Sequence, residues 1–123
     1  MKDLNIIMAK MLKLKTNLNN SEFYISSLAI GILEGMKSGT VPFEVGIWSL
    51  GRPVFWNNFD NTNSLSDDLL NCIKTFDEID SIKSASSHRS ALKMIEELLT
   101  SLRTCQKNSL LNSPDLKLSS FIE

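Results

Sequence analysis

A chain of 123 residues, 42% hydrophobic and 22% charged, has the size and composition of one globular domain, which excludes disorder along its whole length. Its net charge of −1 excludes an overall basic field that would favour nucleic acid. No stretch approaches the roughly 18 apolar residues that span a bilayer, and lysines interrupt the N-terminal run that a secretory signal would need unbroken. We therefore expect a cytoplasmic protein, residues 1–123 forming a single domain, that binds neither nucleic acid nor membranes.

The N-terminal residues carry apolar side chains at helical spacing, which predicts an amphipathic helix over about the first 15 residues. A second helix should begin at Asn20 or Ser21, either of which can cap it, and end at Gly39. Gly31, Gly35 and Gly39 recur every four residues, and this spacing suggests that another helix approaches closely. The apolar positions of the first helix are Leu4, Ile7, Met8, Met11, Leu14 and Leu18.

The segment 38–56 concentrates glycine, proline and both tryptophans of the chain. Pro42 suits the first turn of a short helix over 43–50, and Gly51 suits its left-handed end. The pair Arg52 and Pro53 then requires an extended or turned backbone. We expect a rigid aromatic corner here.

Trp48, Arg52 and Trp56 in this corner are of the residue types most enriched at interface hot spots. Two interpretations stay open at this point. The tryptophans can belong to the core of a small helical domain, or they can be exposed to a protein partner. Arg52 can stack on one of the aromatic rings or pair with a carboxylate.

The polar run 57–64 is typical of a surface loop, and Ser66 with Asp67 and Asp68 behind it predicts a helix start. The serine-rich stretch 81–90 indicates a connection before a last long helix. A short closing helix should begin at residues 113–115. Because no run alternates convincingly enough for a strand, the predicted fold class is all-α, a single-domain bundle of five or six helices. The buried stripe of the fourth helix should comprise Leu69, Cys72, Ile73, Phe76 and Ile79.

Charge is segregated along the chain, with a basic N-terminus and an acidic middle. The acidic residues lack the glycine and ligand spacing of a calcium loop, so we expect no metal site. A solvated helix face or an acidic docking surface for a basic partner explains them better. The candidate partner-binding carboxylates are Asp67, Asp68, Asp77, Glu78 and Asp80.

Catalytic chemistry has little support in this sequence. His88 is the only histidine, and no nucleophile stands in a recognisable context such as G-x-S-x-G. Cys72 and Cys105 fall on apolar helix faces, which favours buried, reduced thiols over a disulfide or a nucleophile. We expect a non-catalytic protein without a cofactor, and an enzyme of unknown type is a third interpretation behind two kinds of binding protein.

The stretch LAIGILEGMKSGTVPFEVGIWSLGRPVF, followed by the acidic DDLLNCIKTFDEID, resembles immunity proteins of bacterial contact-dependent growth inhibition and related polymorphic toxin systems. The resemblance implies a protein that binds a cognate toxin domain, commonly a nuclease, and blocks it. Its partner would then be a basic toxin domain. The alternative is an adaptor or regulatory subunit that binds a protein through the corner between Trp48 and Trp56. The sequence leaves the oligomeric state open.

Overall fold

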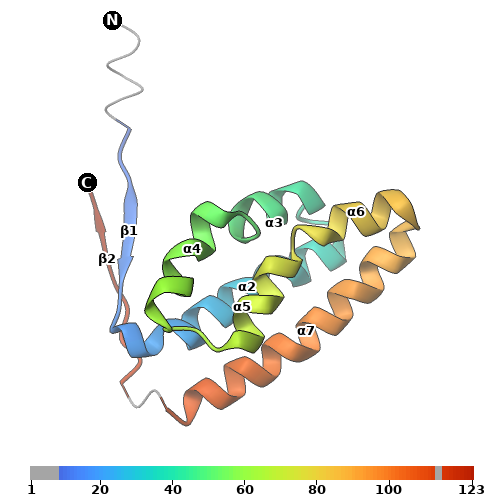
Figure 1. Ribbon diagram of the computed structural model, residues 1–123. Coiled ribbons are helices and arrows are strands. Elements are labelled where there is room, and N and C mark those ends of the chain that lie inside the picture. The colour runs from blue at the N-terminus through green and yellow to red at the C-terminus, as the bar shows by residue number, and fades with distance from the viewer. Residues whose placement is uncertain (1–8, 113–114) are drawn as a thin grey trace, which may run out of the picture.

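A computed structural model describes residues 9–112 and 115–123. Helices α2 to α7 form an elongated body, and strands β1 and β2 form a ribbon that extends from one end of it (Figure 1). The predicted all-α single-domain fold is confirmed, and the ribbon is an addition to it. In chain order the elements are β1 (Leu12–Lys15), the 3-10 turn η1 (Leu18–Asn20), α2 (Ser21–Ser38), α3 (Phe43–Leu50), α4 (Pro53–Thr62), α5 (Asp67–Thr75), α6 (Glu78–Ala85), α7 (His88–Leu110) and β2 (Ser119–Ile122).

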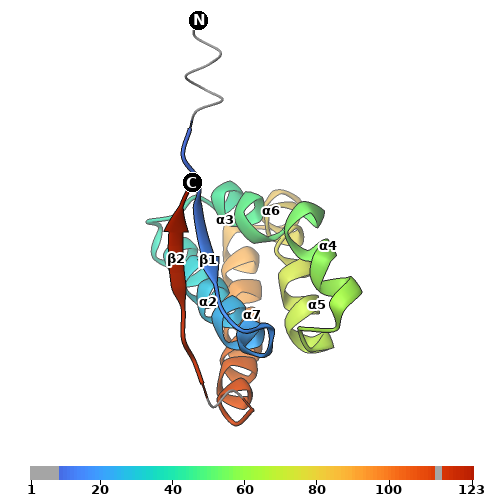
Figure 2. The same cartoon turned by 90° about the vertical axis from the view of Figure 1, so that its left-hand side faces the viewer.

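Helices α2 and α7 pack side by side and supply much of the core (Figure 2). Helix α2 ends at Gly39, whose φ of 86° is the left-handed conformation expected of a terminal glycine. Helix α7 begins after Ser87, whose hydroxyl accepts the Ser90 N–H. The predicted bounds of α2 are therefore confirmed, and the predicted last long helix is present as α7. Their buried apolar residues are Ala29, Leu33 and Met36 of α2, and Ala91, Ile95, Leu98, Leu99, Leu102 and Cys105 of α7.

Helix α5 completes the core between α4 and α7. Its predicted cap is confirmed, because the Ser66 hydroxyl accepts the Leu69 N–H at 3.2 Å. The predicted apolar stripe is also confirmed, with Phe76 and Ile79 fully buried just past the helix end. The chain bends between Thr75 and Glu78 and continues as α6, so this stripe spans two helices.

The serine-rich connection was predicted too long. Helix α6 continues to Ala85 and α7 starts at His88, which leaves Ser86 and Ser87 between them. The serines give α6 a weak helix propensity. The helix forms nevertheless because Ile79 is buried in the core, and this tertiary packing outweighs the propensity.

The predicted loop over 57–64 was wrong, because α4 runs from Pro53 through Thr62. Pro53 occupies the first turn, where proline is tolerated, and Arg52 before it is extended as predicted. Phe55, Trp56 and Phe59 follow helical spacing and pack against the core, which anchors a segment whose asparagines alone would favour a turn.

Three glycines differ from their predicted roles. Gly51 has a φ of −81°, so it is not left-handed; it lies where a Cβ would come within 3.0 Å of the Ile47 carbonyl oxygen. A Cβ placed at Gly31 would have no neighbouring atom within 4 Å, so no helix approaches there. A Cβ placed at Gly35 would meet the side chain of Val41, which lies in the loop after α2 and not in another helix. The close helix approach occurs instead where Gly46 of α3 meets α2.

The ribbon contradicts the predictions for both chain ends. Residues 1–8 of the predicted first helix lie outside the described residues, as do 113–114 at the start of the predicted closing helix. Leu12–Lys15 is a strand, paired antiparallel with Ser119–Ile122. The sequence LKLK alternates with period two as well as matching a helix face, and a partner more than 100 positions away decides between them.

Candidate functional site

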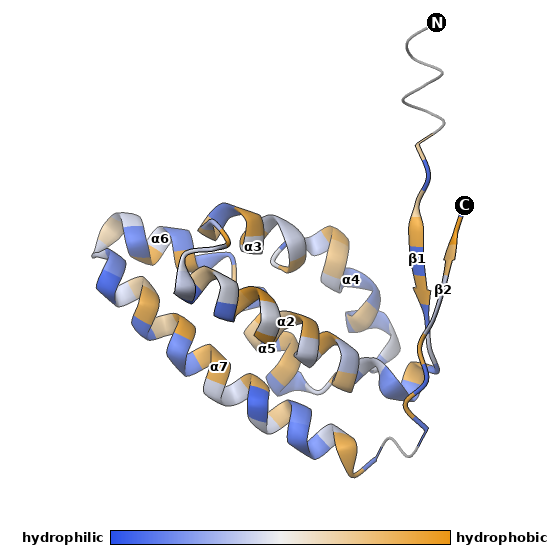
Figure 3. Cartoon of the chain, turned by 180° about the vertical axis from the view of Figure 1, so that it is seen from behind, coloured by the Kyte–Doolittle hydropathy of each residue, from blue (hydrophilic) through white to orange (hydrophobic). Residues whose placement is uncertain are grey.

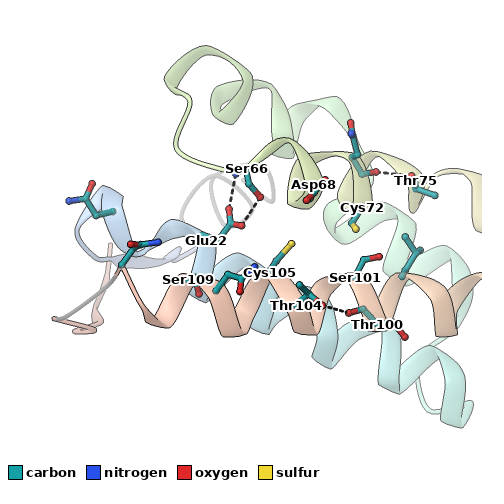
Figure 4. A pocket seen from close by; sticks show the side chains of 15 residues that line it. Glu22, Ser66, Asp68, Cys72, Thr75, Thr100, Ser101, Thr104, Cys105 and Ser109 are labelled. Atoms are coloured by element: carbon teal, nitrogen blue, oxygen red, sulfur yellow. Dashed lines mark hydrogen bonds between the residues drawn. The ribbon is translucent and has the colours of Figure 1, made fainter.

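An open groove of about 730 Å³ lies between α5 and α7, with the start of α2 at one end (Figure 4). Helix α5 contributes Asp68 and Cys72 to its walls, and α7 contributes Ser101, Thr104 and Cys105. The volume falls within the range of roughly 300 to 1,000 Å³ that ligand pockets occupy.

Most residues that line the groove are of polar or acidic type, although it lies between two helices that share an apolar core. Fifteen residues line it. Leu98 is its large aliphatic lining residue, Glu22 and Asp68 are its charged ones, and none of the fifteen is a lysine, arginine or histidine. The other lining residues carry hydroxyl, amide or thiol groups, so the groove offers many hydrogen-bonding atoms and two negative charges.

The Glu22 carboxylate is held at one end of the groove. It accepts the Ser66 backbone N–H at 2.8 Å and the Ser66 hydroxyl at 2.6 Å. Because Ser66 also caps α5, this contact joins the start of α2 to the start of α5. The carboxylate therefore lies at the N-terminal end of α5, where the helix dipole is positive.

The two thiols of the chain lie in the same groove, on facing helices (Figure 4). Burial is the main cause that raises the pKa of Cys72 to about 11, and the neighbouring Cys105 and Asp68 contribute to the same rise. Burial also raises the pKa of Cys105, with Glu22 as the next cause. Both thiols are buried and free, as predicted, and they stay protonated at neutral pH.

The five predicted carboxylates do not form one surface. All are exposed, but Asp67 and Asp68 lie at the start of α5, whereas Asp77, Glu78 and Asp80 lie where α6 begins. The nine residues of α5 separate the two groups by about 13 Å. Of the five, Asp68 is the one that lines the groove.

Electrostatically, these five carboxylates are available to a partner. Within residues 9–112 and 115–123, none of them forms an ion pair. Nor does this part of the chain bring together three or more histidine, cysteine, aspartate or glutamate side chains that could hold a metal ion.

The aromatic corner is split between surface and core. Trp48 is 68% exposed on α3, and the Arg52 guanidinium lies over its ring, 3.9 Å from the centroid. Two further apolar side chains close to them in sequence are also exposed, Val45 in α3 and Val54 in α4. Trp48 is therefore a surface residue, and its contact with a protein partner stays a prediction.

Trp56 belongs instead to the core side of α4, where it packs against buried residues. The Lys74 ammonium lies 4.6 Å from its ring centroid and is paired with Asp60 at 3.2 Å. Its indole Nε1 is buried and has no hydrogen-bond partner among the described residues. The core interpretation is therefore correct for Trp56.

His88 is exposed in the first turn of α7, and its ring stacks on Phe43 with centroids 5.4 Å apart. The groove itself was missed. Its sequence signal is the run of small polar residues at helical spacing on the α7 face next to the apolar seam, at Thr100, Thr104 and Asn108.

Comparisons of the chain with protein-family models, with curated proteins and with solved structures found no match. Among the described residues, no helix is long and apolar enough to cross a membrane. Function is therefore argued from the chemistry of the surface itself, and the resemblance to immunity proteins stays a hypothesis.

Proposed function

We propose that this chain is a non-catalytic binding protein that captures a basic segment of a partner protein in the groove between α5 and α7. The observation that carries the proposal is the lining of the groove, with Glu22 and Asp68 as its charges and no cationic side chain. A lysine or arginine side chain would meet carboxylates, hydroxyls and amide oxygens, which are the acceptors it requires.

A groove already fixed by packing favours such binding. Glu22 is positioned by its two hydrogen bonds to Ser66, and Asp68 projects from a capped helix. Little ordering of these groups is needed on binding, which lowers the entropic cost. Asp67 beside the groove adds negative charge that attracts a cationic partner over a Debye length of about 8 Å at physiological salt.

The biological role that fits this chemistry best is immunity against a toxin. A nuclease binds its substrate through basic side chains that contact phosphate. Carboxylates presented in a groove compete with phosphate for the same side chains and would block substrate binding. This role rests on the resemblance to immunity proteins together with the acidic groove.

A hexa-arginine peptide tests the groove without knowledge of the natural partner. In an NMR titration, we expect amide shifts centred on α5 and α7, and binding that weakens severalfold between 50 and 300 mM salt. Asp68→Asn should weaken binding about fivefold. Asp80→Asn is the matched control, since Asp80 is an exposed carboxylate outside the groove, and its effect should stay within about twofold. Equal effects of the two substitutions would contradict the proposed site.

The immunity role needs a separate test. The protein encoded immediately upstream should be toxic when its C-terminal region is expressed alone and harmless when this chain is co-expressed. Asp68→Lys should abolish the rescue, whereas Asp80→Lys should preserve it. A harmless upstream product would overturn the immunity role while leaving the groove to be judged by the peptide titration.

A second candidate function is an adaptor that binds through the corner. The observation in its favour is Trp48, an exposed aromatic residue with Arg52 stacked on it. Binding of this kind would be lost in Trp48→Ala and would depend weakly on salt. Tryptophan fluorescence that moves to shorter wavelength when the partner is added would support it.

A further inference from the structure

One face of the ribbon is apolar and exposed. All residues of β1 and β2 are exposed, so no other described element buries this face. The pairing places Leu12 opposite Ile122 and Leu14 opposite Ser120, so these side chains share a face, and Leu118 joins them by alternation. Leu12 is 67% exposed, Leu14 63% and Ile122 68%. Figure 3 shows that both strands of the ribbon carry hydrophobic stretches and lie outside the helical body. A two-stranded ribbon is marginally stable alone, and a third strand would stabilise it.

The hydrogen-bond register shows which backbone groups remain free. Met11 and Glu123 exchange both of their backbone hydrogen bonds, at 2.6 and 3.1 Å. In an antiparallel pair every second residue bonds inward, so Lys13 and Phe121 also bond inward. The N–H and C=O groups of Ser120 and its neighbours at 118 and 122 therefore point outward, along the open edge of β2. Figures 1 and 2 show this edge facing away from the helices.

The two open edges differ in charge. Along β1, self-pairing centred on Lys13 or Leu14 would place lysines directly opposite lysines, which is destabilising. Along β2, an antiparallel pair centred on Ser120 has no such conflict. It places Lys117 opposite Glu123 of the second copy, twice by symmetry, and Leu118 opposite Ile122.

We propose that β2 pairs with β2 of a second copy of this chain, about a two-fold axis at Ser120, to form a four-stranded sheet. The pairing satisfies the outward backbone groups of both copies and joins two apolar faces into one. Its opposite-charge pairs fix the register, because a shift of two residues moves Glu123 away from Lys117 of the other copy.

Sedimentation equilibrium of the full chain from 1 to 200 µM tests the pairing. We expect a concentration-dependent dimer. Ser120→Pro removes an outward N–H without breaking a bond to β1, and it should weaken the dimer about tenfold or more. Leu12→Pro is the matched control, because it removes an outward N–H from the other edge, and it should leave the dimer constant within about threefold.

A charge exchange keeps the test decisive if a proline disturbs the ribbon, which circular dichroism would reveal. Lys117→Glu should weaken the dimer severalfold, because it places like charges opposite each other. Adding Glu123→Lys should recover part of this loss, and only part, since Glu123 also forms an ion pair with Lys13 of its own ribbon. A chain that stays monomeric at 200 µM would overturn the proposal. A dimer that is insensitive to Ser120→Pro and to the charge exchange would overturn it as well.

Discussion

Helices α7 and α4 belong to the same body but are held in it very differently. Ile95, Leu99 and Leu102 of α7 are fully buried, whereas α4 has no buried residue. The aromatic side chains of α4 are partly buried and pack on the outside of the core. The core is therefore built mainly by α2, α5 and α7, with buried residues added by α3 and α6, and α4 is an attached element.

This difference separates the two candidate surfaces. The groove is formed by α5 and α7, with α2 at its end, so its walls are part of the cooperative core. The corner is formed by α3 and α4, and α4 is the helix with least burial. A groove on rigid helices suits a partner that binds a preformed shape, whereas a corner beside a weakly held helix can change on binding.

The largest expected effect is on the free energy of unfolding, and it compares a substitution in α7 with one in α4. Leu99→Ala should lower the free energy of unfolding by about 3 kcal/mol, because it leaves a cavity at a fully buried position. Phe59→Ala on α4 should lower it by only about 1 to 2 kcal/mol, since that ring is partly exposed. Urea unfolding followed by circular dichroism measures both. Equal losses would show that α4 belongs to the core.

The sequence predicted best those elements whose ends carry local signals. Ser66 before α5 and Gly39 after α2 are a cap and a terminator whose effects depend on adjacent backbone groups. Helix α4 was missed because Asn57 and Asn58 favour turns locally, and the contacts of Phe55 and Phe59 that overrule them are tertiary. The ribbon was missed because its pairing is non-local.

For the candidate site, the sequence supplied the type of residue but not the arrangement. Asp68 and Asp80 are indistinguishable as exposed carboxylates in an acidic stretch, yet only the first lines the groove. Which helix faces meet is decided by packing between α5 and α7. Trp48 and Trp56 illustrate the same point, because one is on the surface and the other against the core.

A smaller effect follows from the thiols in the groove. The pKa of Cys72 is raised to about 11 from an ordinary value of 9.0, so between these two values the unfolded state loses a proton that the folded state keeps. Stability is fully retained below pH 9 and falls as the pH rises through this window, by about 2 kcal/mol.

Unfolding titrations in urea at pH 8, 9 and 10.5 measure this loss. The informative quantity is the difference between the native chain and Cys72→Ala, because it isolates the contribution of this thiol. We expect a shallower decline with pH in the variant. Parallel declines would show that the Cys72 thiol is not held neutral in the core around the groove.

The smallest effect distinguishes the two tryptophans. Trp48→Ala should change the free energy of unfolding by less than about 0.5 kcal/mol, because the side chain is 68% exposed and only Arg52 stacks on it. Trp56→Ala should lower the free energy of unfolding by about 2 kcal/mol, since that ring packs against the core.

Fluorescence gives a second measurement of the same difference. Emission of the Trp48→Ala variant should lie at shorter wavelength than that of Trp56→Ala, because its remaining indole is the more buried one. If Trp48→Ala were the more destabilising of the two, α3 and α4 would owe their packing to the stacked Trp48–Arg52 pair, and the corner would be a structural element instead of a free surface.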